Sequence, residues 1–115
     1  MPVEILHNPR CSKSRQTLAI LEENGVKPVI VDYLSNPPSV EELRKILGLL
    51  DMQPRDLMRK GEAEYKENIL SDGSLTSEQL LQAMVDFPKL IERPIVLANG
   101  QARIGRPPES VLEII

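Results

Sequence analysis

The chain contains a single cysteine, Cys11, and a single histidine, His7, among its 115 residues. One cysteine excludes a disulfide bond within the chain and is typical of proteins from a reducing compartment. One histidine and one cysteine are too few for a structural zinc site, so we expect no bound metal. Aromatic residues make up only 3% of the sequence, which argues against base stacking as a function.

An excess of positive charge and long apolar runs are also missing. The formal net charge of −3 at pH 7 argues against nucleic-acid binding, because nucleic-acid-binding proteins usually carry a basic excess. No apolar run approaches membrane-spanning length, and Met1–Glu4 lacks the basic and apolar regions of a signal peptide. We therefore expect a cytoplasmic protein that binds neither nucleic acid nor membranes.

The order of the predicted elements indicates an α/β fold in one domain, residues 1–115. Residues 3–6 and 28–33 are short, apolar stretches typical of strands, and a helical pattern over 14–24 lies between them. Such a βαβ unit implies parallel strands. In the last third, strands at 95–98 and 101–104 flank Asn99-Gly100, a strong hairpin signal, and a short helix follows at 109–114.

Residues 39–87 are expected to form a helical insertion between these two halves. Capping boxes predict helices that begin near Ser39 and near Thr76, with Gly48 close to the end of the first. A further helix start lies at 53–56, and a weakly amphipathic segment covers 62–70. A βαβ half joined to a ββα half predicts a thioredoxin-like fold, with a mixed four-stranded sheet and helices packed on it.

Cys11 lies where the first strand ends and the first helix begins. Free N–H groups and the positive end of the helix dipole favour a thiolate there. A lone cysteine is commonly a buried apolar residue, but this one has polar or basic neighbours, Arg10, Ser12, Lys13, Ser14 and Arg15. We therefore expect Cys11 to be a reactive thiol.

Ser14 occupies the position of the second cysteine in a C-x-x-C motif. Because a single thiol cannot close its own disulfide, redox turnover must use a thiol from another molecule, such as glutathione, glutaredoxin or thioredoxin. His7 either tunes the thiolate and transfers protons, or caps the first strand by bonding a backbone group. The residues themselves leave both roles open.

Three arginines occupy junctions between predicted elements, namely Arg59, Arg93 and Arg106. In a thioredoxin-like fold, the proline loop before the third strand packs against the cysteine loop, which places Arg93 near Cys11. The planar donor fork of arginine suits tetrahedral oxyanions. The three side chains are therefore either ordinary surface charges or the binding groups for an oxyanion that the sulfur attacks.

Several motifs, in this order along the chain, resemble the glutaredoxin-coupled arsenate reductase family. They are His7-Asn8-Pro9-x-Cys11-x-x-Ser14-Arg15, Tyr33-Leu34-x-Asn36-Pro37-Pro38, Leu57-x-Arg59-Lys60, Arg93-Pro94-Ile95-Val96 and Arg106-Pro107. Four residues differ from well-established arsenate reductases and point to a less-characterised branch: Arg10, Ser12, Lys13 and Gly105. Gly105 stands where some members carry a second cysteine.

The resemblance implies that Cys11 binds arsenate covalently, that glutathione adds as a co-substrate, and that glutaredoxin resolves the adduct and releases arsenite. It implies no tightly bound cofactor. Its site residues would be Cys11 as nucleophile, His7, Ser14 and Arg15 around the thiolate, Arg59, Arg93 and Arg106 on the oxyanion, and Pro94 as a cis-proline. Two alternatives are a redox-sensing adaptor of RNA polymerase, which typically carries a C-x-x-C switch, and a monothiol oxidoreductase, which needs no arginine triad.

Overall fold

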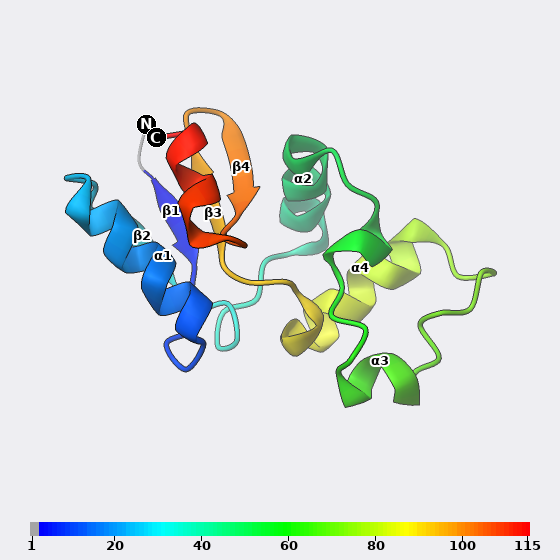
Figure 1. Cartoon of the computed structure of the whole chain (residues 1–115). Helices are drawn as coiled ribbons and strands as arrows, with labels where there is room; N and C mark the ends of the chain where they lie inside the picture. Colours follow the sequence, from blue (N-terminus) through cyan, green and yellow to red (C-terminus); the bar gives the residue numbers. More distant parts are fainter. Residues whose placement is uncertain (1–2) are drawn as a thin grey trace. The chain divides into compact units, whose positions relative to one another are not determined.

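The computed structural model describes residues 3–115 and contains a mixed four-stranded sheet (Figure 1). The strands are β1 (Glu4–Leu6), β2 (Val29–Val31), β3 (Ile95–Ala98) and β4 (Gln101–Ile104), and they lie in the order β2-β1-β3-β4. Strands β1 and β2 are parallel, whereas β3 is antiparallel to both β1 and β4. The sheet therefore has the predicted thioredoxin-like arrangement.

The chain forms two compact units. The sheet unit consists of residues 3–36 and 93–115, and it contains the four strands, helix α1 (Ser12–Glu23) and the 3₁₀ helix η3 (Pro108–Glu113). The helical unit is Pro37–Glu92 and contains the segment 39–87, for which the sequence predicts helices.

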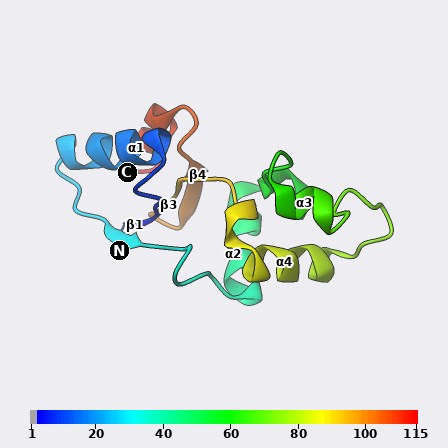
Figure 2. The same cartoon turned by 90° about the horizontal axis from the view of Figure 1, so that it is seen from below.

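The core of the sheet unit lies between the sheet and the pair formed by α1 and η3. These two helices pack against each other on the same face of the sheet (Figures 1 and 2). Ile5 and Val96 lie opposite each other in neighbouring strands and are fully buried, together with Leu21 of α1 and Val111 of η3. Burying one such side chain contributes about 1.5–3 kcal/mol, so this cluster fixes α1, and with it the cysteine loop, on the sheet.

Turn residues in the sheet unit adopt the predicted left-handed conformations. Gly25, with φ +76, follows the C-cap of α1, and Asn99 and Gly100 have φ values of 52 and 72, as a tight hairpin turn requires. Two boundaries differ from the prediction. Helix α1 begins at Ser12 rather than Ser14, and the last helix is a 3₁₀ helix that begins at Pro108.

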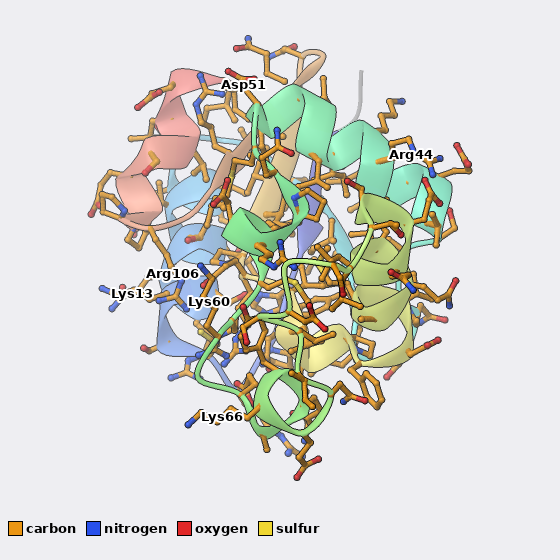
Figure 3. All side chains as sticks on the ribbon, turned by 90° about the vertical axis from the view of Figure 1, so that its right-hand side faces the viewer. Lys13, Arg44, Asp51, Lys60, Lys66 and Arg106 are labelled. Atoms are coloured by element: carbon orange, nitrogen blue, oxygen red, sulfur yellow. The ribbon has the colours of Figure 1, made fainter. Side chains whose placement is uncertain are left out.

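The helical unit contains α2 (Val40–Leu50), η1 (Pro54–Leu57), α3 (Ala63–Glu67), α4 (Ser77–Asp86) and η2 (Pro88–Leu90). Helix α4 packs against α2, η1 and η2. Arg44 of α2, labelled in Figure 3, forms ion pairs with Glu41 on its own helix and with Glu78 on α4. The two longest helices of the unit are therefore joined by apolar packing and by charge.

Gly48 lies near the end of α2, as predicted, and Leu49 and Leu50 extend the helix to a left-handed C-cap at Asp51. Another segment of the unit is less helical than predicted. The segment predicted to be helical over 62–70 holds only the five residues of α3, because the Asn68 side chain bonds the Glu64 carbonyl and ends the helix.

The two predicted capping boxes have different outcomes. The box of Thr76 and Gln79 is complete, with both reciprocal hydrogen bonds present. At α2, the Ser39 hydroxyl accepts the Glu42 N–H as predicted, but the Glu42 carboxylate accepts the Ser39 hydroxyl instead of the Ser39 backbone N–H. Across residues 3–115, every helix falls short of the length and apolar character that crossing a membrane requires.

Candidate active site

The register of the sheet brings the predicted cysteine loop and the proline loop to one edge. Leu6 at the end of β1 pairs with Val31 at the end of β2 and with Ile95 at the start of β3. The residues after β1 and β2 and before β3 therefore share this edge. The Arg93–Pro94 peptide bond is cis, as the resemblance implies, and the Arg106–Pro107 bond is also cis, which the sequence analysis did not predict.

Cys11 is the N-cap residue of α1. Its backbone is extended, with φ −93 and ψ 124, and its carbonyl accepts the Arg15 N–H at 3.0 Å. The Cys11 N–H donates to the Asn8 carbonyl at 3.0 Å, which closes the loop before the helix. Serine, threonine and aspartate usually place an oxygen over the free N–H groups of a helix start. The Cys11 side chain makes no capping hydrogen bond, but the nearby N–H groups of Ser14 and Lys13 act on its pKa.

This environment lowers the pKa of the Cys11 thiol below its ordinary value. Partial burial raises the pKa, but the Ser14 N–H, the Arg93 guanidinium and the Lys13 N–H together lower it by more. All three donors stabilise the thiolate and not the thiol. The structure thus supplies the physical cause for the reactive thiol that the sequence predicts.

Two arginines from distant parts of the sequence lie at the sulfur. Arg93 donates a hydrogen bond to Cys11, and Nη2 of Arg106 (labelled in Figure 3) lies 3.9 Å from the Cys11 sulfur. The Arg106 Nε also donates to the Arg93 carbonyl at 2.9 Å, which ties the two arginine loops together. Burial lowers the pKa of Arg93, but its bond to the thiolate outweighs this and the net pKa is raised.

Tyr33 is a further residue of this cluster that the analysis of the sequence did not assign to the site. It is fully buried two residues beyond β2, and its hydroxyl interacts with the Arg93 guanidinium and helps to raise the pKa of Arg93. The sequence signals for it were its place at the end of the second predicted strand and in the motif Tyr33-Leu34-x-Asn36-Pro37-Pro38; β1 and β2 are parallel and end at the same edge. Tyr33 therefore belongs to the surroundings of the guanidinium that contacts Cys11.

The side chains of His7 and Ser14 are bonded to each other. The His7 Nδ1 lies 2.6 Å from the Ser14 hydroxyl oxygen, which also accepts the Asn8 N–H at 3.0 Å. Both side chains are buried, with 7% of His7 and none of Ser14 exposed. The sequence leaves two roles open for His7: it either tunes the Cys11 thiolate or caps the first strand through a backbone group. In the structure, the imidazole bonds the side chain of Ser14 in α1, which is not the contact expected of a strand cap.

The pKa of His7 lies below its ordinary value of 6.5. Burial is the main cause and Arg15 adds to it, while the negative charge of Asp32 acts in the opposite direction. A histidine with a lowered pKa is neutral at pH 7 and offers one donor and one acceptor nitrogen.

The Nη1 of Arg15 donates to the Pro9 carbonyl at 2.9 Å, so Arg15 spans the loop that holds Cys11.

The loop that carries Arg106 approaches α1 very closely at Gly105. The Gly105 N–H donates to the Pro94 carbonyl at 2.9 Å. A Cβ atom at this position would lie 2.4 Å from Thr17 Oγ1 and 2.8 Å from Pro94 Cγ, well inside contact distance. Glycine therefore allows the arginine loop, the cis-proline loop and the first helix to meet.

Arg59 belongs to the helical unit, where it contacts Leu90 and Glu62. Its N–H donates to the Leu90 carbonyl at 2.6 Å, and its guanidinium pairs with Glu62 at 3.2 Å. The sheet unit thus brings together Cys11, His7, Ser14, Arg15, Arg93 and Arg106, whereas Arg59 is positioned by its own neighbours. Within residues 3–115, we find no cluster of three or more His, Cys, Asp or Glu side chains able to hold a metal ion.

The chain is similar to known proteins over nearly all of its length. Residues 6–114 match the ArsC family. The uncharacterized protein YfgD of Escherichia coli is 61% identical, covering 98% of this chain and 96% of that protein. An arsenate reductase of Haemophilus influenzae is 48% identical, with complete coverage of both chains. The solved structure of an arsenate reductase from Vibrio cholerae is 54% identical, covers 100% of this chain and 98% of its own, and superposes with a TM-score of 0.97. These similarities show that the chain belongs to the ArsC family.

Proposed function

We propose that this chain reduces arsenate to arsenite and that the Cys11 thiolate is the nucleophile. The observation that carries this proposal is the position of the only thiol of the chain, at the N-terminus of α1 and beside Arg93 and Arg106. The same cations that stabilise the thiolate are suited to hold the oxygens of a tetrahedral oxyanion during attack by the sulfur. The names of the relatives in the family point to arsenate as that oxyanion.

The residues around the thiolate have distinct roles in this proposal. Arg93 and Arg106 bind the oxyanion and its reduced product. Ser14 and His7 hold the first turn of α1 in place, and Arg15 closes the cysteine loop. Each of these contacts is fixed before substrate arrives, and such preorganised donors lower the barrier to charge development.

The atoms and electrons of the proposed reaction balance with two external thiols. The Cys11 sulfur attacks arsenic, a sulfur–arsenic bond forms, and one arsenate oxygen leaves as water. The glutathione sulfur then bonds to arsenic, and a second oxygen leaves as water. A glutaredoxin thiolate attacks the glutathione sulfur, the glutathione–arsenic bond breaks, and its electron pair passes to arsenic, which changes from As(V) to As(III); the two external thiols leave as a mixed disulfide. Water then cleaves the remaining bond between Cys11 and arsenic, which releases arsenite and restores the Cys11 thiolate.

The source of the electrons follows from the sequence of the chain. Because Cys11 is its only cysteine, the second thiol must come from outside, and we propose glutathione and glutaredoxin in that role. Both are molecules of the reducing cytoplasm, where we place the protein. The chain itself needs no tightly bound cofactor for this chemistry.

The proposal is tested by arsenate-dependent NADPH oxidation in an assay coupled to glutathione, glutaredoxin and glutathione reductase. We expect turnover by the native chain and a loss to background in Cys11→Ser. Equal rates for the two proteins would refute it.

The assay also separates the proposal from the alternatives. Arg93→Ala and Arg106→Ala should lose arsenate turnover, whereas Arg103→Ala, at a half-buried arginine that pairs with Glu113, should retain it and serves as the matched control. A chain that reduces glutathione mixed disulfides equally well with and without Arg93 and Arg106 would be a monothiol oxidoreductase. Retention of RNA polymerase subunits in a pull-down, without arsenate turnover, would indicate an adaptor.

A further inference from the structure

Two exposed cations flank Cys11 in the sheet unit. Arg10 directly precedes it, and Lys13 (labelled in Figure 3) lies in the first turn of α1. Within residues 3–115, neither of these two side chains forms an ion pair or a hydrogen bond, whereas the neighbouring Arg15 is bonded to the Pro9 carbonyl. Both side chains are therefore available to bind a molecule that approaches the partly exposed sulfur.

The position of these two cations is unfavourable for the helix itself. The N-terminus of a helix carries the positive end of the helix dipole, so acidic residues stabilise it and cations destabilise it. Helix α1 has no acidic residue in its first turn and begins instead between Arg10 and Lys13. The Cys11 thiolate offsets part of this charge, but its side-chain contacts are with Arg93 and Arg106. A local preference that is broken in this way is typical of a functional site.

The proposed reaction defines which molecule comes to this position. Once the oxyanion is attached to Cys11, the glutathione sulfur must bond to the arsenic beside it. Glutathione is a tripeptide with its thiol on the central residue and a carboxylate at either end. A cation on either side of Cys11 matches this arrangement of charges, and arginine and lysine bind carboxylates through charge-assisted hydrogen bonds.

We propose that Arg10 and Lys13 bind the two carboxylates of glutathione and thereby select this thiol as the reductant. This inference rests on the proposed function, in which glutathione is the co-substrate. Attraction of the two carboxylates raises the local concentration of glutathione at Cys11 and orients its thiol toward the arsenic. Thiols without carboxylates gain no such advantage.

Thiol–disulfide exchange measures this recognition without arsenate. The Cys11 thiolate attacks one sulfur of glutathione disulfide, the bond between the two glutathione sulfurs breaks, and one glutathione leaves as a thiolate while the other stays bonded to Cys11. The same exchange with 2-hydroxyethyl disulfide involves no carboxylate. Because the thiolate fraction of Cys11 enters both rate constants equally, their ratio reports recognition of the carboxylates and not the pKa of the thiol.

The decisive variant is Arg10→Gln/Lys13→Gln. Its ratio of the rate constant for glutathione disulfide to that for 2-hydroxyethyl disulfide should be about threefold to tenfold below the native ratio at low salt. The native ratio should fall as salt is added, because exposed charges are screened beyond about 10 Å at 0.1 M ionic strength, and the variant ratio should change little.

The matched control is Lys27→Gln/Lys45→Gln, which removes two exposed cations at other places and should keep the native ratio. An unchanged ratio in Arg10→Gln/Lys13→Gln, or an equal fall in the control, would overturn the inference.

The coupled arsenate assay supplies a second measurement. In Arg10→Gln/Lys13→Gln, the KM for glutathione should rise while the KM for arsenate changes little. A rise in the KM for arsenate alone would assign the two cations to the oxyanion and would also overturn the inference. A native chain that does not turn over arsenate would refute the proposed function, and the exchange ratio would still decide whether Arg10 and Lys13 recognise glutathione.

Discussion

Replacing Ser14 with alanine should destabilise the fold far more than the loss of one hydroxyl suggests. Ser14 is fully buried, and its hydroxyl oxygen serves two groups, the His7 imidazole at 2.6 Å and the Asn8 N–H at 3.0 Å. No water can reach the vacated position unless the loop opens. The variant would therefore leave two buried polar groups without a partner.

The size of the effect follows from those two contacts. A buried donor or acceptor that loses its partner costs about 1–3 kcal/mol. Alanine is a better helix former than serine, which returns about 0.5 kcal/mol. Two such groups cost about 2–6 kcal/mol, so we expect the free energy of unfolding to fall by about 1.5–5.5 kcal/mol.

Urea denaturation of Ser14→Ala beside Ser12→Ala measures this difference. Ser12 is exposed in the same turn of α1, so its replacement should change the free energy of unfolding by at most about 0.5 kcal/mol. If the two variants unfold at the same urea concentration, the bonds to His7 and Asn8 do not stabilise the loop, and our account of the cysteine loop is wrong.

Two further predictions concern the titrating groups of the site. Burial lowers the pKa of His7 in the folded chain. As the pH falls, the unfolded chain therefore takes up a proton near pH 6.5, and the folded chain takes up its proton only at a lower pH. The stability due to His7 is complete above pH 6.5 and is lost as the pH falls through the folded pKa. His7→Asn should therefore show a flatter loss of stability between about pH 7 and pH 5 in denaturation series, and a profile as steep as that of the native chain would contradict this. Arg93→Gln should raise the pKa of Cys11, seen as slower alkylation by iodoacetamide at pH 7, while Arg103→Gln, at the half-buried arginine paired with Glu113, should behave as the native chain. Identical alkylation rates for the native chain and Arg93→Gln would show that Arg93 does not stabilise the thiolate.

The sequence predicts those parts of the fold that depend on local chemistry. The hairpin at Asn99-Gly100 and the end of α1 at Gly25 follow from residues that tolerate positive φ, and both are present. The βαβ order, together with the rule on parallel crossovers, was sufficient to predict the sheet. The close approach of Arg93 to Cys11 followed from the same fold.

Features that depend on packing between distant segments could not be predicted. Nothing near Tyr33 in the sequence indicates that its hydroxyl reaches Arg93, because that contact depends on two loops that meet only in the folded chain. The same applies to Gly105, whose lack of a side chain matters only because Thr17 and Pro94 lie against it. The helix ends at Asp51 and Asn68 depended on side-chain bonds and backbone conformations that propensity does not resolve.

The cationic surroundings of Cys11 also affect how its thiolate is oxidised under oxidative stress. A partly exposed thiolate reacts with peroxide to give a sulfenic acid, and a chain with one cysteine has no second thiol to trap it as a disulfide. Without rapid capping by glutathione, oxidation continues to the sulfinic acid, which is irreversible in most proteins. The product is itself an oxyanion attached at the Cys11 sulfur, beside Arg93 and Arg106. The two arginines would then stabilise the sulfinate of Cys11, and this covalently attached anion would inactivate the protein by occupying the oxyanion site.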